Sequence, residues 1–476
     1  MSTKKPTGTA PKSGTNPSQS GKTRLTGEIL ALLATLVLAV LAFQLNASMV
    51  TPALPHIARV FEVGDGTVGQ VSSIFFLAGA VAGVILTRWS DFIGRKRTLM
   101  IVLTILAIGT LVCIFAVNFP MLLVGRFLQG TSGAIFQLVY MILREATNEA
   151  TFASVIGVIT AINGGVAGID AWVGGWLTEQ FGFRSLFIVI LCAIVAAIVA
   201  AQLVVKERPL EEVTGTMDWA GGAVMAVALI LITYYFNFAG TDGWFAPIPR
   251  LLLAGTVAAF VVFYFIEKRS SSPMFSIDLL KSRTTWPLIA TTLLCLASVF
   301  AVINFIVTIL AQNFNVGFGL SADVAALLYL TPPALIGLVA APVSGYLSGK
   351  IGWFVVLRGG IILSMVAILV IALFSSNQWI VFAMICILGA TYNGMILTTI
   401  NGLGVVLASS EAPGALPAFN GAAFGIGASL GIGIVAPYVG LGTSLGFTAA
   451  LYIALGIAGL ALVCSLILKA RPGQTI

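Results

Sequence analysis

The hydrophobic residues of this chain fall into stretches of roughly 20 residues separated by short polar breaks. That is the length a helix needs to cross about 30 Å of hydrocarbon. Hydrophobic residues make up 59% of the 476 residues, and charged residues only 9%. A soluble domain carries roughly 25% charged residues, so this composition fits a lipid solvent. The sequence therefore predicts an all-α polytopic membrane protein.

The polar breaks predict fourteen spans, and an even number returns both termini to one side of the membrane. The spans are placed near Leu30–Ala53, Val68–Trp89, Leu99–Val117, Met121–Leu143, Ala153–Leu177, Phe183–Val205, Trp219–Ala239, Leu251–Ile266, Pro287–Ala311, Val324–Ser348, Val356–Phe374, Trp379–Leu407, Ala415–Tyr438 and Ser444–Leu468. Residues 27–206 and 285–469 are expected to form two six-helix bundles, and residues 207–284 a linker with two additional spans. Residues 1–26 are too polar to bury a core and are expected to be a disordered cytoplasmic tail, and residues 470–476 a second tail.

Lysine and arginine flank the expected spans almost entirely on one side, and basic flanking residues are retained in the cytoplasm. With the N-terminus inside, only Arg59, Arg184 and Arg250 of the 24 basic residues fall on the outer side. The net charge of +7 follows from this topology, because these residues are not gathered on one face as nucleic-acid binding requires. We expect a multi-pass protein of the plasma (inner) membrane, with both termini cytoplasmic and no nucleic-acid partner.

The reactive residues indicate neither an enzyme nor a metal site. The single histidine, His56, has no second ligand or nucleophile at a useful spacing. The five cysteines fall in separate spans without CxxC spacing, and the sequence contains no P-loop motif. We therefore expect no enzymatic activity, metal or cofactor, and a transport function would draw its energy from an ion gradient.

A polar segment between the second and third spans carries a family resemblance. Asp91, Gly94, Arg95 and Lys96 match motif A of the major facilitator superfamily, which this segment resembles. A weaker echo, Gly345–Gly352, occupies the equivalent place in the second block. The resemblance implies the major facilitator fold, in which two six-helix bundles rock about a central site, here with two extra central spans.

Three further segments narrow this resemblance. In the fourth span, Leu123–Ala134 is similar to motif B of the superfamily, including its intramembrane Arg126. In the first span, Leu45–Pro55 resembles the signature of the fourteen-span drug:proton antiporters, the DHA2 family, although Asn46 stands where they have aspartate. In the fifth span, the antiporter motif C keeps only its last two glycines, and Asp170 replaces its first residue.

Arg126 and Asp170 are the ionisable residues that fall inside the expected spans, where such residues are costly and usually functional. At about 1.5 Å per residue, both lie roughly 9–10 Å below the outer boundary on consecutive helices. We hypothesise that they pair, and that Asp170 takes over the proton-carrying role of the aspartate missing from the first span. The alternative is a purely structural bridge between two helices.

Neutral polar residues inside other spans are candidates for a substrate cavity. Gln137 and Tyr140 share one face of the fourth span with Arg126. The full set comprises Asn46, Gln137, Tyr140, Asn163, Asn304, Tyr392, Asn393, Asn401 and Asn420. Each could instead make a hydrogen bond that only packs helices together. A mostly uncharged lining of this kind would suit an amphiphilic or weakly charged organic molecule.

A cytoplasmic gate is expected from the charged residues of motif A. Asp91 and Arg95 are one helical turn apart, and Glu145 ends the fourth span on the same side. Together with Gly94 and Lys96 they could form an acid–base–acid cluster that holds the inner gate closed, as the resemblance also implies. An ordinary basic loop that only fixes topology would explain the same residues.

Three functions remain open at this point. The leading one is proton-coupled efflux of small amphiphilic compounds or drugs, with protons as the coupling ion and the protein acting as a monomer in the bilayer. The second is import or facilitated movement of a specific metabolite, which the missing aspartate and the altered motif C favour. The third is a non-transporting receptor or a lipid-handling protein on the same fold.

Overall fold

The computed structural model describes residues 27–147, 166, 168–207, 217–270, 281–407 and 415–469. These residues form helices, and none of them lies in a β-strand. Twelve helices in this part of the chain are long and apolar enough to cross a membrane, judged by length and composition. The all-helical polytopic architecture predicted from the hydrophobic stretches is therefore confirmed. The two expected tails, residues 1–26 and 470–476, lie outside the described residues.

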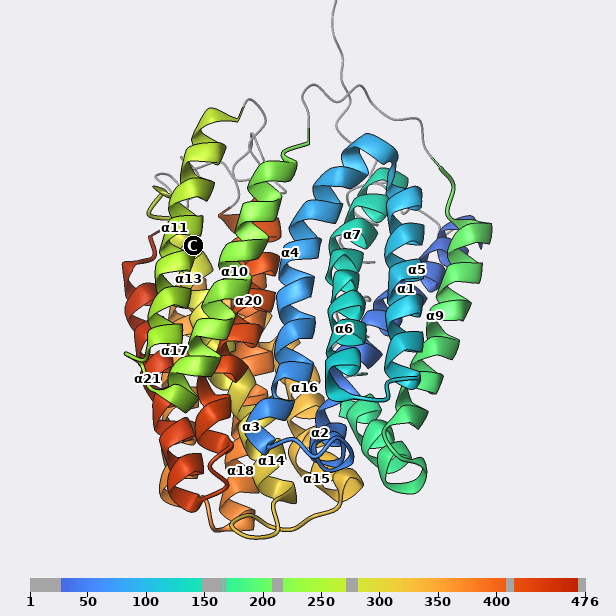
Figure 1. The fold of residues 1–476 in the computed structure, drawn as a ribbon. Coiled ribbons are helices and arrows are strands. Elements are labelled where there is room, and N and C mark those ends of the chain that lie inside the picture. Colours follow the sequence, from blue (N-terminus) through green and yellow to red (C-terminus); the bar gives the residue numbers. More distant parts are fainter. Residues whose placement is uncertain are drawn as a thin grey trace, which may run out of the picture.

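The first half of the chain, residues 27–207, consists of long helices that run up and down the molecule (Figure 1). Its elements are α1 (Gly27–Ser48), η1 (Thr51–Ala53), α2 (Leu54–Val60), α3 (Asp65–Val68), α4 (Gln70–Ile93), α5 (Arg95–Ile114), α6 (Phe119–Gly130), η2 (Thr131–Ala134), α7 (Ile135–Ala146) and α9 (Arg184–Val204). Residues 168–181, which precede α9, are also helical.

A hairpin of two helices, α10 (Trp219–Asp242) and α11 (Pro247–Arg269), separates the first half from the second half, residues 281–469. The second half contains α13 (Thr285–Cys295), η3 (Leu296–Phe300), η4 (Val302–Ile306), α14 (Val307–Gln312), α15 (Ala322–Tyr329), α16 (Thr331–Ile351), α17 (Trp353–Leu373), α18 (Gln378–Leu388), η5 (Gly389–Leu397), α19 (Thr398–Val406), α20 (Ala415–Val439) and α21 (Ser444–Ile467).

The twelve spans found by length differ from the fourteen expected ones at two places. The expected span Met121–Leu143 is built from α6, the short 3-10 segment η2 and α7, stacked end to end in Figure 1, and each piece alone is too short to be counted. The expected span Ala153–Leu177 falls partly outside the described residues, which resume with the helical residues 168–181. The count of fourteen therefore stays a prediction.

Two glycines place matching turns in the two halves. Gly94, between α4 and α5, has φ 98° and ψ 147°, and Gly352, between α16 and α17, has φ 97° and ψ 142°. Side chains strongly disfavour this positive-φ conformation, so glycine is the residue that fits both turns. The weak sequence echo of motif A therefore corresponds to the same backbone turn at the same place in each half.

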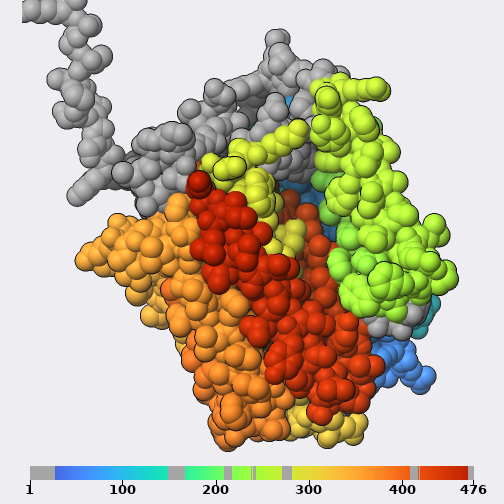
Figure 2. Space-filling view, turned by 90° about the vertical axis from the view of Figure 1, so that its left-hand side faces the viewer, coloured from blue at the N-terminus to red at the C-terminus, as the bar shows by residue number. Residues whose placement is uncertain are grey.

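We name the two ends of the helical bundle by residues that lie there. The end that carries the α4–α5 turn is the Arg95 end, and the opposite end, which carries α3, is the Asp65 end (Figure 1). The α10–α11 hairpin lies beside the seam between the halves, because α10 packs against α4 of the first half and α20 of the second. Figure 2 shows the hairpin in yellow-green next to the C-terminal helices in red.

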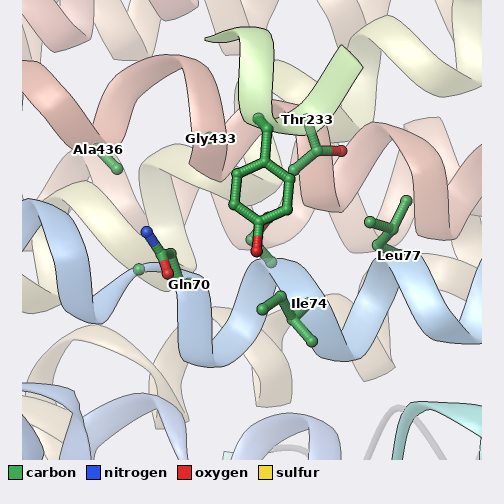
Figure 3. Close-up of a pocket in the computed structure, with 9 residues that line it drawn as sticks. Gln70, Ile74, Leu77, Thr233, Gly433 and Ala436 are labelled. Carbon is green, nitrogen blue, oxygen red and sulfur yellow. The ribbon is translucent and has the colours of Figure 1, made fainter. Parts of the chain in front are cut away.

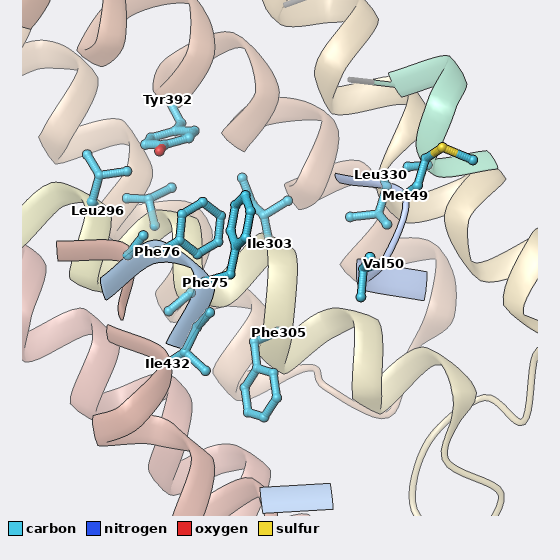
Figure 4. Packing of buried hydrophobic residues seen from close by; sticks show 14 of the residues in the cluster. Met49, Val50, Phe75, Phe76, Leu296, Ile303, Phe305, Leu330, Tyr392 and Ile432 are labelled. Atoms are coloured by element: carbon cyan, nitrogen blue, oxygen red, sulfur yellow. The ribbon is translucent and has the colours of Figure 1, made fainter. Parts of the chain in front are cut away.

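Three segments of the second half are π-helical: η3, η4 and η5. A π-helix inserts one extra residue into a turn and is often found where a helix serves a function. Two of these segments carry the expected cavity residues Asn304 and Tyr392. Tyr392 faces the buried core, where Figure 4 shows it in one cluster with Phe75 and Phe76 of the first half and Leu296 of the second.

Candidate functional site

A continuous row of aromatic rings crosses the interior from the first half to the second. We call it the aromatic ridge; successive ring centroids along it are 5.1 to 6.4 Å apart. Its members, in order, are Tyr140 and Phe136 of α7, Phe43 of α1, Phe75 and Phe76 of α4, Phe300 of η3 and Phe424 of α20.

The ridge has a buried base and a partly open surface. Phe75 and Phe76 are 1% and 7% exposed, whereas the other five rings are partly exposed. Polar residues in the spans do not indicate this ridge, and phenylalanine is too common in membrane helices to mark it. The one local signal was the four-residue spacing of Phe136 and Tyr140, which places both rings on one helix face.

Arg126 lies under this ridge, fully surrounded by the first half. Its side chain is 1% exposed and donates hydrogen bonds to the carbonyl oxygens of Val71 (3.0 Å) and Asn46 (3.2 Å) and to Oε1 of Gln129 (2.8 Å). Its guanidinium also stands 4.4 Å from the centre of the Phe75 ring, at the distance of a cation–π contact. Arg126 therefore ties α6 to α1 and α4 and supports the base of the ridge.

Asp170 has a different partner from the one expected. Its carboxyl group is 4% exposed, and its Oδ2 accepts a hydrogen bond from Ser48 Oγ of α1 at 2.6 Å. Its Oδ1 accepts no hydrogen bond of good geometry among the described residues. The ion pair expected between Arg126 and Asp170 is not formed, so that hypothesis is wrong for this conformation. The physical reason is that three neutral acceptors within the first half already engage the guanidinium.

The surroundings of Asp170 connect the two halves. Two residues before it, the carbonyl oxygen of Gly168 accepts a hydrogen bond from Thr331 Oγ1 of α16 at 2.6 Å. Beyond it, Gly174 packs against Met49 and Gly175 against Ala322, where an added Cβ would come within 2.5 and 2.6 Å of backbone oxygens. The helical segment 168–181 is thus held closely by both α1 and the second half. Spacing along the chain does not indicate Ser48 as the partner of Asp170.

Two amides expected in the cavity lie in the described part of the first half, besides Tyr140 of the aromatic ridge. Asn46 is fully buried, and its Nδ2 donates to the carbonyl oxygen of Ala42 at 2.9 Å, while its Oδ1 has no hydrogen-bond partner among the described residues. Within the same described part of the chain, Gln137 of α7 also has a buried Oε1 without a partner, and its Nε2 points to the seam between α4 and α20. Asn163, the third amide assigned to this half, lies outside the described residues.

The expected cavity residues of the second half divide into packed and open ones. Asn304 and Asn393 donate to the carbonyl oxygens of Phe300 (3.2 Å) and Pro333 (3.4 Å), and Asn420 Oδ1 accepts from Thr292 Oγ1 at 2.5 Å. The bonds of Asn393 and Asn420 join two helices, which is the helix-packing alternative that the sequence left open, whereas the bond of Asn304 stays within its own helical stretch. Tyr392 is buried, and its hydroxyl group has no partner in the part of the chain that the structure describes, whereas Asn401 is exposed on α19.

The charged residues of motif A do come together at the Arg95 end. Asp91 accepts from Arg88 at 3.0 Å and from Arg95 at 2.6 Å, and Arg95 Nε lies 3.3 Å from Glu145 Oε1. Lys96 donates to the carbonyl oxygen of Gln202 on α9 at 3.0 Å. These contacts fasten the α4–α5 turn to α7 and α9 within the first half.

Among the described residues, the hydrogen bonds between the halves lie on the Asp65 side of the bundle or near its middle. Gln312 Nε2 donates to the carbonyl oxygen of Pro52 at 3.0 Å, and Asn313 Nδ2 lies 3.5 Å from Asp65 Oδ2. Ser73 Oγ donates to the carbonyl oxygen of Ser429 at 3.2 Å, and Thr331 makes the bond to Gly168 described above. At the same end, Gly66 packs so closely on α20 that an added Cβ would lie 2.6 Å from a backbone oxygen.

A narrow pocket of about 20 Å³ lies at the seam where α10 covers α4 and α20 (Figure 3). It is lined by Gly69, Gln70, Ser73, Ile74, Leu77, Thr233, Tyr234, Gly433 and Ala436. This volume is about that of one water molecule, so the pocket is a packing defect rather than a substrate site.

Comparison with known proteins identifies the family. A sequence model of the Major Facilitator Superfamily matches residues 36–432, which is most of the chain. The chain belongs to the Major Facilitator Superfamily. As a member of this superfamily, it is a multi-pass membrane transporter of small molecules and not an enzyme.

Its relatives in the superfamily differ in what they carry. The chain is 38% identical over 437 residues to a uridine/deoxyuridine transporter of Lactococcus lactis subsp. cremoris (strain MG1363), covering 90% of this chain and 91% of the relative. It is 26% identical over 412 residues to the multidrug resistance protein Stp of Mycobacterium tuberculosis (strain CDC 1551 / Oshkosh), covering 86% of this chain and 75% of that protein.

Solved structures of other transporters share the fold. The nucleoside transporter NupG aligns with a TM-score of 0.63 at 12% sequence identity, over 92% of this chain and 100% of NupG. The human organic anion transporter MFSD10 (TETRAN) also aligns with a TM-score of 0.63, at 14% identity and the same coverage. At such identities the similarity concerns the fold alone.

Proposed function

We propose that this transporter carries a pyrimidine nucleoside of the uridine type across the membrane by alternating access. The observation that carries the proposal is the 38% identity, over 90% of the chain, to a uridine/deoxyuridine transporter. The proposal takes up the second function left open by the sequence, movement of a specific metabolite. It replaces drug efflux as the leading interpretation, because the drug-resistance relative is only 26% identical.

The interior chemistry supports a ligand of this kind. A nucleoside is neutral and combines a flat heteroaromatic base with a sugar rich in hydroxyl groups. Partly exposed rings of the aromatic ridge, such as Phe136 and Phe300, can stack on a base, and such stacking is worth about 1–3 kcal/mol per base. The polar residues beside the ridge are amides and hydroxyls that suit uncharged hydrogen-bonding groups: Asn46, Gln137, Tyr140, Asn304, Tyr392, Asn393 and Asn420, with Asn163 and Asn401 assigned to the same lining.

The conformation suggests which way the site opens. Gln312 and Asn313 tie the second half to the first at the Asp65 end, which supports a state that is closed there and open toward the Arg95 end. We assign the Arg95 end to the cytoplasm because basic residues flank the spans on that side. Transport then consists of the bundles 27–206 and 285–469 rocking about the ridge, with both termini cytoplasmic, fourteen spans in total and a single chain as the working unit.

The gate and the coupling ion are assigned on the same basis. The cluster of Asp91, Arg95 and Glu145 would hold the cytoplasmic end of the first bundle in one piece, with Gly94 and Lys96 fixing its turn. We assign proton coupling to Asp170. Its carboxyl group is buried, accepts a hydrogen bond from Ser48 of α1, and lies close to the contact between the two halves. Arg126 would hold the helices beneath the aromatic ridge in place and would not pair with Asp170.

Uptake into proteoliposomes tests the proposal. Purified protein is reconstituted, and entry of radiolabelled uridine is followed with and without an inward proton gradient. We expect saturable uptake that unlabelled uridine and deoxyuridine compete for and that lipophilic cations do not. Saturable transport of a lipophilic cation with no transport of uridine would overturn the proposal in favour of drug efflux.

A further inference from the structure

The side chain of Gln137 occupies a distinct position between the two halves. It projects from α7 toward α4 and α20, where both neighbouring helices carry glycine. An ideal Cβ on Gly421 of α20 would lie 2.9 Å from Gln137 Nε2, and one on Gly83 of α4 would lie 3.7 Å from the same atom. The carboxamide therefore rests against two stretches of bare backbone, one from each half.

The carbonyl oxygen of this carboxamide is the atom that a ligand could engage. Gln137 Oε1 is buried and accepts no hydrogen bond within the part of the chain that the structure describes. A buried polar group without a partner is costly, so a ligand that satisfies it gains affinity from that bond. Gly421 is exposed although it faces α7, which shows that there is accessible space beside the carboxamide. The terminal torsion angle of glutamine has a broad energy minimum. Rotation about it can therefore turn both the N–H and the C=O group of the carboxamide toward that space.

The aromatic ridge begins at the same turn of α7. Phe136 precedes Gln137 in the sequence, and Tyr140 follows it by three residues, so a flat ligand stacked on these rings would bring its edge to the carboxamide. A carboxamide offers one N–H donor group and one carbonyl acceptor side by side. The imide edge of uracil, formed by the N3–H group and an adjacent carbonyl, offers the complementary acceptor and donor.

We propose that Gln137 recognises the imide edge of the pyrimidine base by two parallel hydrogen bonds. This inference rests on the proposed nucleoside transport and names the residue that reads the base. Since Gly83 and Gly421 approach the same carboxamide from opposite halves, a base bound there is held at the seam and contacts both. Gly421 leaves room for the carboxamide of Gln137, because any side chain at position 421 would displace the amide nitrogen.

A methylated base tests the pairing directly. In 3-methyluridine a methyl group replaces the N3 proton, which removes the donor and blocks the edge while leaving the sugar and the ring faces unchanged. Wild-type protein should bind 3-methyluridine about tenfold or more weakly than uridine, as expected for the loss of net hydrogen bonding of about 1.4 kcal/mol. In Gln137→Ala the ratio of the two affinities should fall toward one. The control Gln70→Ala changes a glutamine of the seam pocket and should keep the wild-type ratio.

The glycine provides a second, independent variant. Gly421→Ala should push the flexible end of Gln137 aside without altering that residue, and so should lower the same affinity ratio. Gly456→Ala, on an open face of α21 with nothing within 4 Å, is its control and should have no effect. A wild-type ratio near one, or a ratio that stays high in Gln137→Ala, would overturn the assignment of Gln137 even if uridine is transported. Absence of uridine binding by the wild-type protein would instead overturn the proposed function itself.

Discussion

Ser48 donates a 2.6 Å hydrogen bond to Asp170 and thereby joins α1 to the helical segment 168–181. The same segment contacts the second half two residues earlier, through Gly168 and Thr331. A change of protonation at Asp170 would therefore act on a contact between helices that also touch the other half. Through these contacts, the protonation state of Asp170 can affect how the two bundles move relative to each other.

The role of Asp170 in coupling can be tested by removing its ability to release a proton. Asp170→Asn keeps the size of the side chain and its capacity to accept from Ser48. We expect uptake driven by an imposed proton gradient to fall to the level seen without a gradient, while exchange of internal for external substrate continues. Ser48→Ala should retain coupling and lose the hydrogen bonds of this hydroxyl group to Asp170 and Gln44, at a net cost of about 1 kcal/mol each. Unchanged gradient-driven uptake in Asp170→Asn would leave Asp170 with a structural role.

We expect Arg126 to contribute mainly to the stability of the folded protein. Arg126→Ala leaves the carbonyl oxygens of Val71 and Asn46 without their donor and removes the support under Phe75. Hydrogen bonds to charged groups are worth about 1.5–3 kcal/mol each, so we expect a loss of about 3 kcal/mol or more and a clearly lower melting temperature in detergent. Arg126→Lys should recover part of the lost stability because lysine keeps the positive charge. The recovery should be incomplete because lysine lacks the planar guanidinium group. Arg144→Ala, at an exposed position on α7, is the control expected to melt like wild type.

The two matching turns predict equal sensitivity in the two halves. Gly94→Ala and Gly352→Ala each force a side chain into a positive-φ conformation, at a cost of about 1–3 kcal/mol. Gly349→Ala changes a helical glycine of α16 that has nothing within 4 Å, and it should be tolerated. Thermal unfolding of the three variants checks this. A Gly352→Ala protein as stable as the Gly349→Ala protein would contradict the equivalence of the turns.

Closure at the Asp65 end should depend on Gln312. Gln312→Ala removes its bond to Pro52, and a loss of about 1 kcal/mol shifts a two-state equilibrium roughly fivefold. Spin labels at Val60→Cys and Asn315→Cys, in a background without native cysteines, report the separation of the halves at this end. We expect a larger population of long distances in Gln312→Ala. Gln378→Ala should not change it, because only the backbone carbonyl of Gln378 takes part in a bond, with Tyr329.

Sequence reasoning was most reliable where one local property decides the outcome. Hydrophobic stretches predicted helices, and the structure brings Asp91 and Arg95 of motif A together with Glu145, because these residues lie on adjacent turns or helix ends. It was weakest for partners of buried polar groups. Arg126 and Asp170 were assigned to each other from equal depth alone, yet depth leaves the rotation of each helix about its axis undetermined.

By itself, the sequence determined that this is a polytopic helical membrane protein with the motifs of its superfamily, because lipid imposes length and apolarity on each span separately. Only the tertiary structure decided that Arg126 bonds to neutral acceptors, that Asp170 bonds to Ser48, and that rings from four helices and a π-helical segment join into one ridge. Such contacts depend on how helices far apart in the sequence are rotated and packed together. In lipid, close packing and interhelical hydrogen bonds set that rotation, and neither is encoded in the periodicity of a single span.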